Sequence, residues 1–356
     1  MVTADASPSA ARVLAHMLEH AGLTVVGTAA DGPAAVEAVR RLQPDVLTLS
    51  VELPQLDGLA VLDEVMTHCP TPTVFVTSLG RARMDRTLTA LERGAVDFVL
   101  KCAPGQQRRP PAEIARELAA KVRMAAGVKV IRRIAVPPRR TTACKQPREP
   151  SSSNVVGGLR RDATHVVVLG ASTGGPPALR AFLSELPRDF AAAVLVVQHI
   201  PAPFTVALAE WLNRTIGPCV RIAEQGDRLR PATVFLAPGD KHLTIRADGR
   251  LELDDGPPQH GYRPAVDRLL VSAAEVFGSR ACGVILSGMG GDGAAGLLAV
   301  RRGGGWTGAQ QEDGCAIFGM PKRAVELGAA QWVADPAALA LRVAEFVHAH
   351  ARSLET

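Results

Sequence analysis

Short apolar runs of strand length recur along this sequence and alternate with segments of helical periodicity. Near-continuous runs of Val, Ile, Leu and Ala are typical of strands buried on both faces in a helix-covered parallel sheet. The alternation therefore predicts an α/β fold of doubly wound parallel sheets. The runs lie at Leu23–Val26, Val46–Leu49, Thr73–Thr77 and Val96–Leu100, and later at His165–Leu169, Ala193–Val197 and Cys282–Leu286.

The alternation is lost between about residues 127 and 162. This stretch contains Pro137–Pro138, Ser151–Ser153 and Gly157–Gly158, which are typical of a linker. A chain of 356 residues has room for two domains. We therefore predict an N-terminal domain at 1–126, a linker at 127–162 and a C-terminal domain at 163–352. Within the C-terminal domain, Lys241–Arg246 and Arg250–Leu253 flank a turn and predict a hairpin.

Part of the net charge of +5 lies in the predicted linker. Because no aromatic residues separate its basic side chains, a solvated linker is favoured over a nucleic-acid site. Hydrophobic residues make up 47% and charged residues 21%, which excludes a disordered chain. The basic residues of the linker are Arg132, Arg133, Arg139, Arg140, Lys145 and Arg148.

No apolar run approaches the roughly 18–20 residues of a membrane helix, and the first residues lack the basic-then-apolar pattern of a secretory signal. We therefore expect a cytoplasmic protein without membrane insertion. The six cysteines are scattered, which predicts reduced structural thiols and no metal site.

One serine follows a buried strand directly. The run Val166–Leu169 leads into Gly170-Ala171-Ser172-Thr173-Gly174 and then into a helical pattern. In open α/β sheets, functional groups gather at the carboxyl ends of strands. A serine in such a glycine-flanked turn holds its hydroxyl outward, near backbone N–H groups that can stabilise an oxyanion. A phosphate-binding loop or a plain turn has the same pattern, so this motif alone leaves all three readings open.

Two further strand ends carry an imidazole and a carboxylate, His199 and Asp292. A serine hydroxyl needs a base to take its proton, and histidine, with an ordinary pKa of ~6.5, suits that role near neutral pH. An acidic residue can hold the imidazole in the required tautomer. Singly, His199 also fits a structural histidine and Asp292 a helix N-cap. Together, Ser172, His199 and Asp292 predict a catalytic triad.

Five separated segments resemble the C-terminal domain of the protein-glutamate methylesterases (CheB), in the right order and over about 160–350. The chain order Ser, His, Asp differs from the Ser, Asp, His order of the α/β-hydrolases, so the serine motif does not indicate that fold. The segments are Gly170–Pro176, Gln198–Pro201, Ala237–His242, Arg263–Asp267 and Gly288–Gly293.

The resemblance implies that Ser172 is the nucleophile, His199 the general base and Asp292 its orienting partner. It implies methylated glutamates and glutamines of methyl-accepting chemoreceptors as substrates, with release of methanol or ammonia and with no cofactor. Thr173 and Met289 lie beside the triad in sequence and are candidates for the oxyanion-hole N–H groups.

Residues 1–126 resemble the response-regulator receiver that precedes this domain in the family, which points to a histidine kinase pathway. Asp5, Thr77 and Lys101 remain of the family's functional set. Ser50 stands where the family has its phospho-accepting aspartate, and Ala6 stands where a second Mg²⁺-binding carboxylate is expected. Losing the acceptor and half of the metal site predicts that phosphotransfer no longer occurs.

Only Met1–Ala4 precede the first turn, which indicates either an eroded domain or a start codon assigned too late. Two other functions compete with a receptor methylesterase. A general serine esterase would use the same triad, and the degenerate receiver is also consistent with a non-catalytic adaptor that binds receptors.

Overall fold

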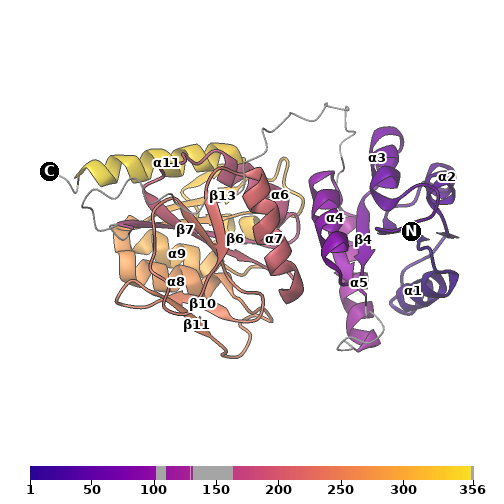
Figure 1. Cartoon of the computed structure of the whole chain (residues 1–356), viewed down its shortest axis with the longest axis horizontal. Helices are drawn as coiled ribbons and strands as arrows, with labels where there is room; N and C mark the ends of the chain where they lie inside the picture. The colour runs from indigo at the N-terminus through magenta and orange to yellow at the C-terminus, as the bar shows by residue number, and fades with distance from the viewer. Residues whose placement is uncertain (102–109, 129, 131–162, 354–356) are drawn as a thin grey trace, which may run out of the picture. The chain divides into compact units, whose positions relative to one another are not determined.

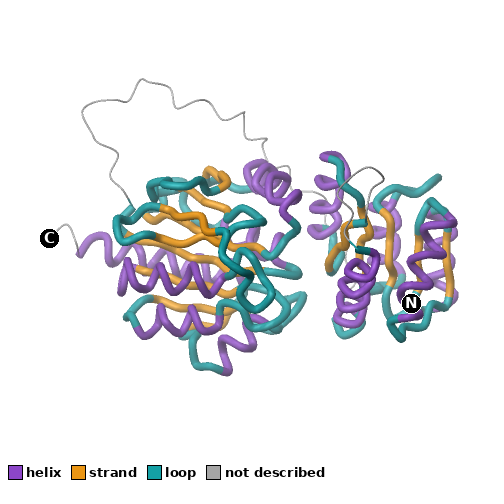
Figure 2. Tube along the Cα trace, turned by 90° about the horizontal axis from the view of Figure 1, so that it is seen from below, coloured by secondary structure: helices purple, strands orange, loops and turns teal. Residues whose placement is uncertain are grey.

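The computed structural model describes residues 1–101, 110–128, 130 and 163–353. The chain divides into two compact units, Met1–Pro138 and Arg139–Thr356. Each unit is built around a parallel sheet with helices beside it, as predicted (Figure 2). The predicted linker lies almost wholly outside the described residues, so its boundaries stay a prediction. No helix in the described ranges is long and apolar enough to cross a membrane.

The first unit has a five-stranded parallel sheet in the order β2-β1-β3-β4-β5. Several of its helices begin at polar caps, as where the Asp57 carboxylate accepts the N–H groups of Leu59 and Ala60. Its elements are β1 (Val2–Ala4), α1 (Pro8–His20), β2 (Gly27–Ala29), α2 (Gly32–Leu42), β3 (Leu47–Ser50), α3 (Gly58–His68), β4 (Thr73–Thr77), α4 (Arg81–Glu92), β5 (Asp97–Leu100) and α5 (Pro111–Ala125).

The prediction of a strand at Leu23–Val26 is wrong, because β2 lies at Gly27–Ala29. The predicted segment leads into the sheet instead. The N–H of Leu23 donates to the Leu18 carbonyl of α1, and the segment bonds beside β1 only through Met1, whose amino group donates to the Thr24 carbonyl and whose carbonyl accepts the Val26 N–H. Leu23 and Val25 are apolar because they pack against the core beside α1 and α5, outside the regular ladder.

The second unit has a seven-stranded parallel sheet in the order β14-β13-β12-β6-β7-β9-β8. Figure 1 shows α11 along one side of this sheet and α8 and α9 along the other. The elements of the sheet and its helices are β6 (His165–Ala171), α6 (Gly175–Ser184), β7 (Ala192–Gln198), α7 (Ala202–Thr215), β8 (Cys219–Ile222), β9 (Thr233–Leu236), α8 (Val266–Phe277), the 3₁₀ helix η2 (Gly278–Arg280), β12 (Ala281–Ile285), α9 (Ala294–Arg302), β13 (Trp306–Gln310), α10 (Met320–Glu326), β14 (Trp332–Ala334) and α11 (Pro336–Ser353).

The predicted hairpin is confirmed as the antiparallel pair β10 (His242–Ile245) and β11 (Leu251–Asp254), which forms a separate two-stranded sheet. It packs against α8. The side chains of Leu243, Ile245 and Leu251 join the main core of the unit. The hairpin therefore supports the helix that begins beside the site described below.

Strand β6 lies in the middle of the second sheet, with β7 on one side and β12 on the other. All residues of these three strands are buried. Because the strands are parallel and in register, their carboxyl ends meet at the same edge of the sheet. The three predicted triad residues follow these three ends.

Candidate active site

Ser172 lies in the tight turn between β6 and α6, with 8% of its surface exposed. Its N–H donates to the carbonyl of Ser287, two residues after β12 (2.9 Å). Gly174 completes the turn with a φ of 73°, a conformation that L side chains rarely adopt. The turn therefore fixes the serine beside the first turn of α6.

His199 follows β7 directly, and its N–H donates to the Ala171 carbonyl of β6 (2.9 Å). Only 6% of its side chain is exposed. Its Nε2 lies 2.9 Å from Oδ2 of Asp292, whereas its Nδ1 is buried and has no hydrogen-bond partner. The structure thus brings His199 and Asp292 together and leaves one imidazole nitrogen available.

Asp292 precedes α9, but its carboxylate caps the start of α8. The backbone N–H groups of Val266 and Asp267 donate to Oδ2 (2.8 Å) and Oδ1 (3.0 Å) respectively. Burial would raise the pKa of this carboxyl, but the hydrogen bonds from His199, Asp267 and Val266 outweigh that effect and lower it. Asp292 is therefore held in its ionised form. It caps the start of α8 and accepts a hydrogen bond from the imidazole at the same time.

An ionised carboxylate can only accept hydrogen bonds, so Nε2 of neutral His199 carries the proton that points to Asp292. The lone pair of the imidazole then resides on Nδ1. This is the nitrogen that can take a proton from a hydroxyl, and the arrangement supplies a base whose tautomer is set by its partner.

Two side chains that the sequence analysis gave no role hold the backbone of this site. The Gln198 amide donates to the carbonyls of Ser172 (2.7 Å) and His199 (3.1 Å). The Ser287 hydroxyl donates to the Thr173 carbonyl (2.7 Å) and accepts the Ile317 N–H (3.0 Å). In the sequence, Gln198 could have been recognised as a polar residue at the end of an otherwise apolar strand.

The two oxyanion-hole candidates both lie on backbone segments near Ser172. Thr173 follows it in the turn, and Met289 follows Gly288, where an added Cβ would lie 2.8 Å from the Ser172 Cβ. Only glycine permits this approach. Among the described residues, the Met289 N–H makes no hydrogen bond, and Met289 is 45% exposed.

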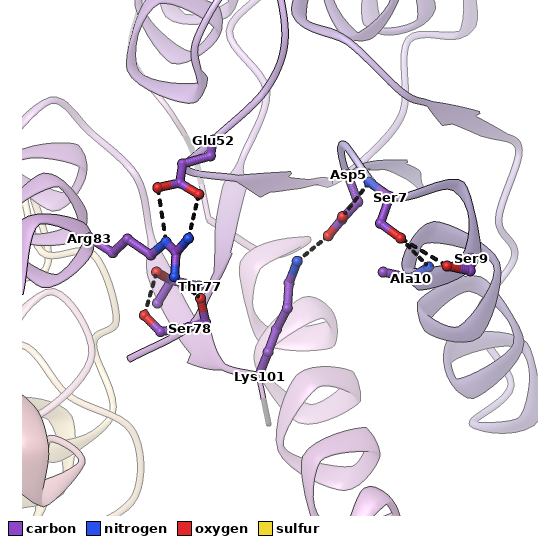
Figure 3. A network of polar contacts seen from close by, with 9 residues as sticks. All are labelled: Asp5, Ser7, Ser9, Ala10, Glu52, Thr77, Ser78, Arg83 and Lys101. Atoms are coloured by element: carbon purple, nitrogen blue, oxygen red, sulfur yellow. Dashed lines mark hydrogen bonds and ion pairs between the residues drawn. The ribbon is translucent and has the colours of Figure 1, made fainter. Parts of the chain in front are cut away.

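The three predicted receiver remnants and Ser50, at the position of the missing acceptor, meet in a pocket of the first unit. Asp5, Ser50, Thr77 and Lys101 all line it, at the carboxyl ends of β1, β3, β4 and β5. Lys101 contacts the Asp5 carboxylate, which also accepts the Ser7 N–H (3.0 Å), as Figure 3 shows. The acidic partner of Lys101 is therefore Asp5.

A second ion pair lies in the same pocket. Arg83 of α4 donates through Nε and Nη2 to the two oxygens of Glu52 (2.9 and 2.8 Å) and through Nη1 to the Ser78 hydroxyl (3.0 Å; Figure 3). The hydrogen bonds from Arg83 lower the pKa of Glu52. The pocket thus holds two cations paired with two carboxylates, and Ser50 supplies a hydroxyl where an acidic acceptor was expected.

Comparison with known proteins gives matches to both units. Residues 167–343 match the CheB methylesterase family, and residues 1–108 match the response regulator receiver domain. A protein-glutamate methylesterase/protein-glutamine glutaminase of Symbiobacterium thermophilum is 44% identical, over 94% of this chain and 92% of that protein. A protein of the same name from Thiobacillus denitrificans is 41% identical, over 92% of this chain and 90% of its own length.

Among solved structures, the CheB methylesterase catalytic domain of Thermotoga maritima is similar to the second unit. It has a TM-score of 0.50 and 40% sequence identity, and the match covers 51% of this chain and 98% of that domain.

Proposed function

The chain belongs to the CheB methylesterase family, and on that premise we propose that it hydrolyses glutamate methyl esters and deamidates glutamines on chemoreceptors in chemotaxis adaptation. It is a hydrolase of the protein-glutamate methylesterase and protein-glutamine glutaminase type. We also propose that it acts on its receptor substrates in the cytoplasm.

The observation that carries the mechanism is the hydrogen bond from His199 Nε2 to Asp292 beside an unpartnered Nδ1. In the proposed reaction, Nδ1 takes the proton of Ser172 as Oγ attacks the ester or amide carbon. The imidazolium then gives this proton to the leaving group, which departs as methanol or ammonia. The product of this half-reaction is a glutamyl ester of Ser172.

Water completes the cycle. His199 removes a proton from the attacking water, the Ser172–glutamyl bond breaks, and the proton returns to Oγ to leave free glutamate and the original enzyme. The negative oxygen formed in each half-reaction is assigned to the backbone N–H groups of Thr173, which follows the nucleophile, and of Met289, which follows the neighbouring Gly288.

Phosphorylation control is proposed to be lost in the first unit. Ser50 cannot form the acyl phosphate that a carboxylate forms, and Ala6 offers no side-chain oxygen to a metal ion. The Lys101–Asp5 ion pair supports this view, because it neutralises the carboxylate that remains.

The direct test is methanol release from chemoreceptors carrying radiolabelled methyl esters, with wild-type protein and Ser172→Ala in parallel. We expect release by wild type alone. Turnover of short acyl esters without methanol release would favour a general esterase. Receptor binding without turnover by either protein would favour an adaptor.

A further inference from the structure

The loop between β11 and α8 carries Tyr262, the single tyrosine of the chain. Gln259 and Tyr262 exchange two backbone hydrogen bonds (3.0 and 2.9 Å). The two residues between them, His260 and Gly261, have φ values of 53° and 84°. Two consecutive residues with positive φ form the tight turn that is typical of two-residue hairpins. The backbone of Tyr262 is therefore held in place from one side.

The other side of this loop is also anchored. The Arg263 guanidinium donates through Nη1 to the carbonyls of Asp255 (3.0 Å) and Gly256 (3.1 Å). The Ala265 N–H donates to Nδ1 of the buried His242 in β10 (3.1 Å). The segment that carries Tyr262 is thus hydrogen-bonded to the first residues of the same loop and to strand β10 of the hairpin.

The Tyr262 ring stacks on the His199 imidazole. The ring centroids are 4.0 Å apart and the planes differ by 2°. An added Cβ on Gly290 would lie 3.8 Å from the Tyr262 hydroxyl oxygen. The half-buried phenol ring therefore reaches from the imidazole to the turn before Asp292, and it covers one face of His199.

The hydrogen bond to Asp292 holds one atom of the imidazole but leaves the tilt of the ring to be set by another contact, because the outer torsion of histidine is broad. A flat stack fixes that tilt. Nδ1 lies on the edge of the ring, so fixing the plane also fixes where this nitrogen points.

The stack also stabilises the positively charged form of His199. When Nδ1 takes the proton of Ser172, the imidazole becomes a cation that lies against an aromatic face, an arrangement with favourable electrostatics. This attraction is absent while His199 is neutral. An interaction that appears with the charge lowers the barrier without tightening substrate binding.

We propose that Tyr262 is a positioning residue of the active site, whose aromatic face fixes the plane of His199 and stabilises the imidazolium formed during attack. This inference rests on the proposed function, because it assumes that His199 is the base. The aromatic ring carries the effect, and the hydroxyl does not.

One charged group contacts the imidazole, two further titratable groups lie next to that group in turn, and all three remain in place in the variants used below. Asp292 bonds to it from the β12–α9 turn. The N–H of Asp267 in α8 donates to the Asp292 carboxylate, and His260 Nε2 is 3.8 Å from the Asp267 carboxylate. A comparison of two substitutions at Tyr262 itself isolates the aromatic face from these charges.

The test compares Tyr262→Leu with the matched control Tyr262→Phe in the full-length protein. We expect Tyr262→Leu to lower kcat about three- to thirty-fold with little change in KM. The acidic limb of its kcat/KM profile should move to lower pH by roughly half a unit, because the imidazolium loses its aromatic neighbour. Tyr262→Phe should restore kcat to within about threefold of wild type.

Three outcomes would overturn the proposal. They are an unchanged kcat and pH profile in Tyr262→Leu, equal damage by Tyr262→Phe, and an effect confined to KM. Thermal unfolding of both variants identifies any loss that comes from misfolding alone.

A second measurement does not depend on receptor turnover. NMR titration of the His199 imidazole in wild type, Tyr262→Phe and Tyr262→Leu should give a lower midpoint only for Tyr262→Leu. If wild type fails to hydrolyse methylated receptors but this difference is present, the proposed function fails and the stacking proposal stands. If all three midpoints agree, the stacking proposal is wrong whatever the substrate.

Discussion

Asp267 and Asp292 cap each other's helices. Asp292 precedes α9 and accepts two N–H groups at the start of α8, whereas Asp267, in the first turn of α8, accepts the Gly296 N–H in the first turn of α9 (2.6 Å). The start of α8 is thus stabilised by a carboxylate from the turn before α9, and the start of α9 by a carboxylate from α8. The loop that carries Asp292 to His199 is held by this reciprocal arrangement.

Asp267→Ala should destabilise the second unit by roughly 1–3 kcal/mol, because a buried N–H loses its acceptor. It should also lower kcat by freeing the start of α9. All three tryptophans, Trp211, Trp306 and Trp332, lie in this unit, so urea unfolding followed by tryptophan fluorescence measures its stability alone.

Asp267→Asn keeps an acceptor and removes the charge, which makes it the matched control. Burial raises the pKa of Asp267; the hydrogen bond from Gly296 opposes this, and the negative charge of Asp292 adds to it. Because the native pKa is raised, the contribution of Asp267 to the free energy of unfolding is largest below the pKa of the unfolded chain, ~3.9. It is lost as the pH rises through the native pKa. The stability of wild type relative to Asp267→Asn should therefore fall from pH 4 to pH 7. A difference independent of pH would contradict this account.

Ser172→Ala and His199→Ala should each lower methylesterase kcat by roughly 10⁴-fold or more, with the fold unchanged. Asp292→Asn should be less damaging than either, since it leaves a misoriented base in place. Methanol release gives kcat, and labelling by a fluorophosphonate probe reports on Ser172 directly. Undiminished turnover by Ser172→Ala would remove that residue from the mechanism.

Gln198→Leu should lower kcat roughly ten- to a hundred-fold, because its amide joins the backbone carbonyls of Ser172 and His199. Gln198→Glu, of the same size, should be at least as damaging, since a carboxylate would face two carbonyl oxygens. Steady-state kinetics of both variants test this. Full activity of Gln198→Glu would show that the bridging amide does not position the site.

Acetyl phosphate with Mg²⁺ should neither label residues 1–126 nor change methylesterase activity, because Ser50 and Ala6 replace the carboxylates that this chemistry needs. Labelling is measured with radioactive acetyl phosphate followed by hydroxylamine. The double variant Ser50→Asp, Ala6→Asp is the positive control for the assay. Stoichiometric hydroxylamine-labile label on wild type would mean that another carboxylate accepts phosphate.

The second unit should lose stability as the pH falls below about 6.5. Burial, followed by His350 and Arg280, lowers the pKa of His165, whose Nε2 is buried without a partner. A lowered native pKa for a base means that the unfolded chain takes up the proton first, so acid favours unfolding. The stability penalty begins below the unfolded pKa of ~6.5 and is complete below the native pKa.

Urea unfolding at pH 7.5 and pH 5.5 measures this loss, which should be smaller in His165→Leu. Exposed His348 lies in the same unit, and His348→Gln is the control that should keep the wild-type pH dependence. An equal loss in His165→Leu and wild type would assign the effect to other groups, among them His242, whose pKa burial also lowers.

Much of the fold, and the positions of the three residues proposed as a triad at one edge of the sheet, could be predicted from the sequence, because both depend on local patterns. Side-chain burial repeats along a strand or helix, and the residues after a parallel strand are carried to one edge of the sheet. The positions of Ser172, His199 and Asp292 after β6, β7 and β12 follow from these rules. The shift of β2 from Leu23–Val26 shows the limit, since apolar residues also pack outside the ladder.

The contacts within the candidate site were decided by the tertiary structure. The neighbours of β6, the capping of α8 by Asp292 and the stack of Tyr262 on His199 join segments that are distant in the sequence. Their pairing depends on strand order, helix packing and the path of a loop, none of which has a local periodicity. The tertiary structure also determines that Nδ1 is the imidazole nitrogen of His199 left without a partner, because the Asp292 carboxylate that bonds to Nε2 comes from the segment after a different strand.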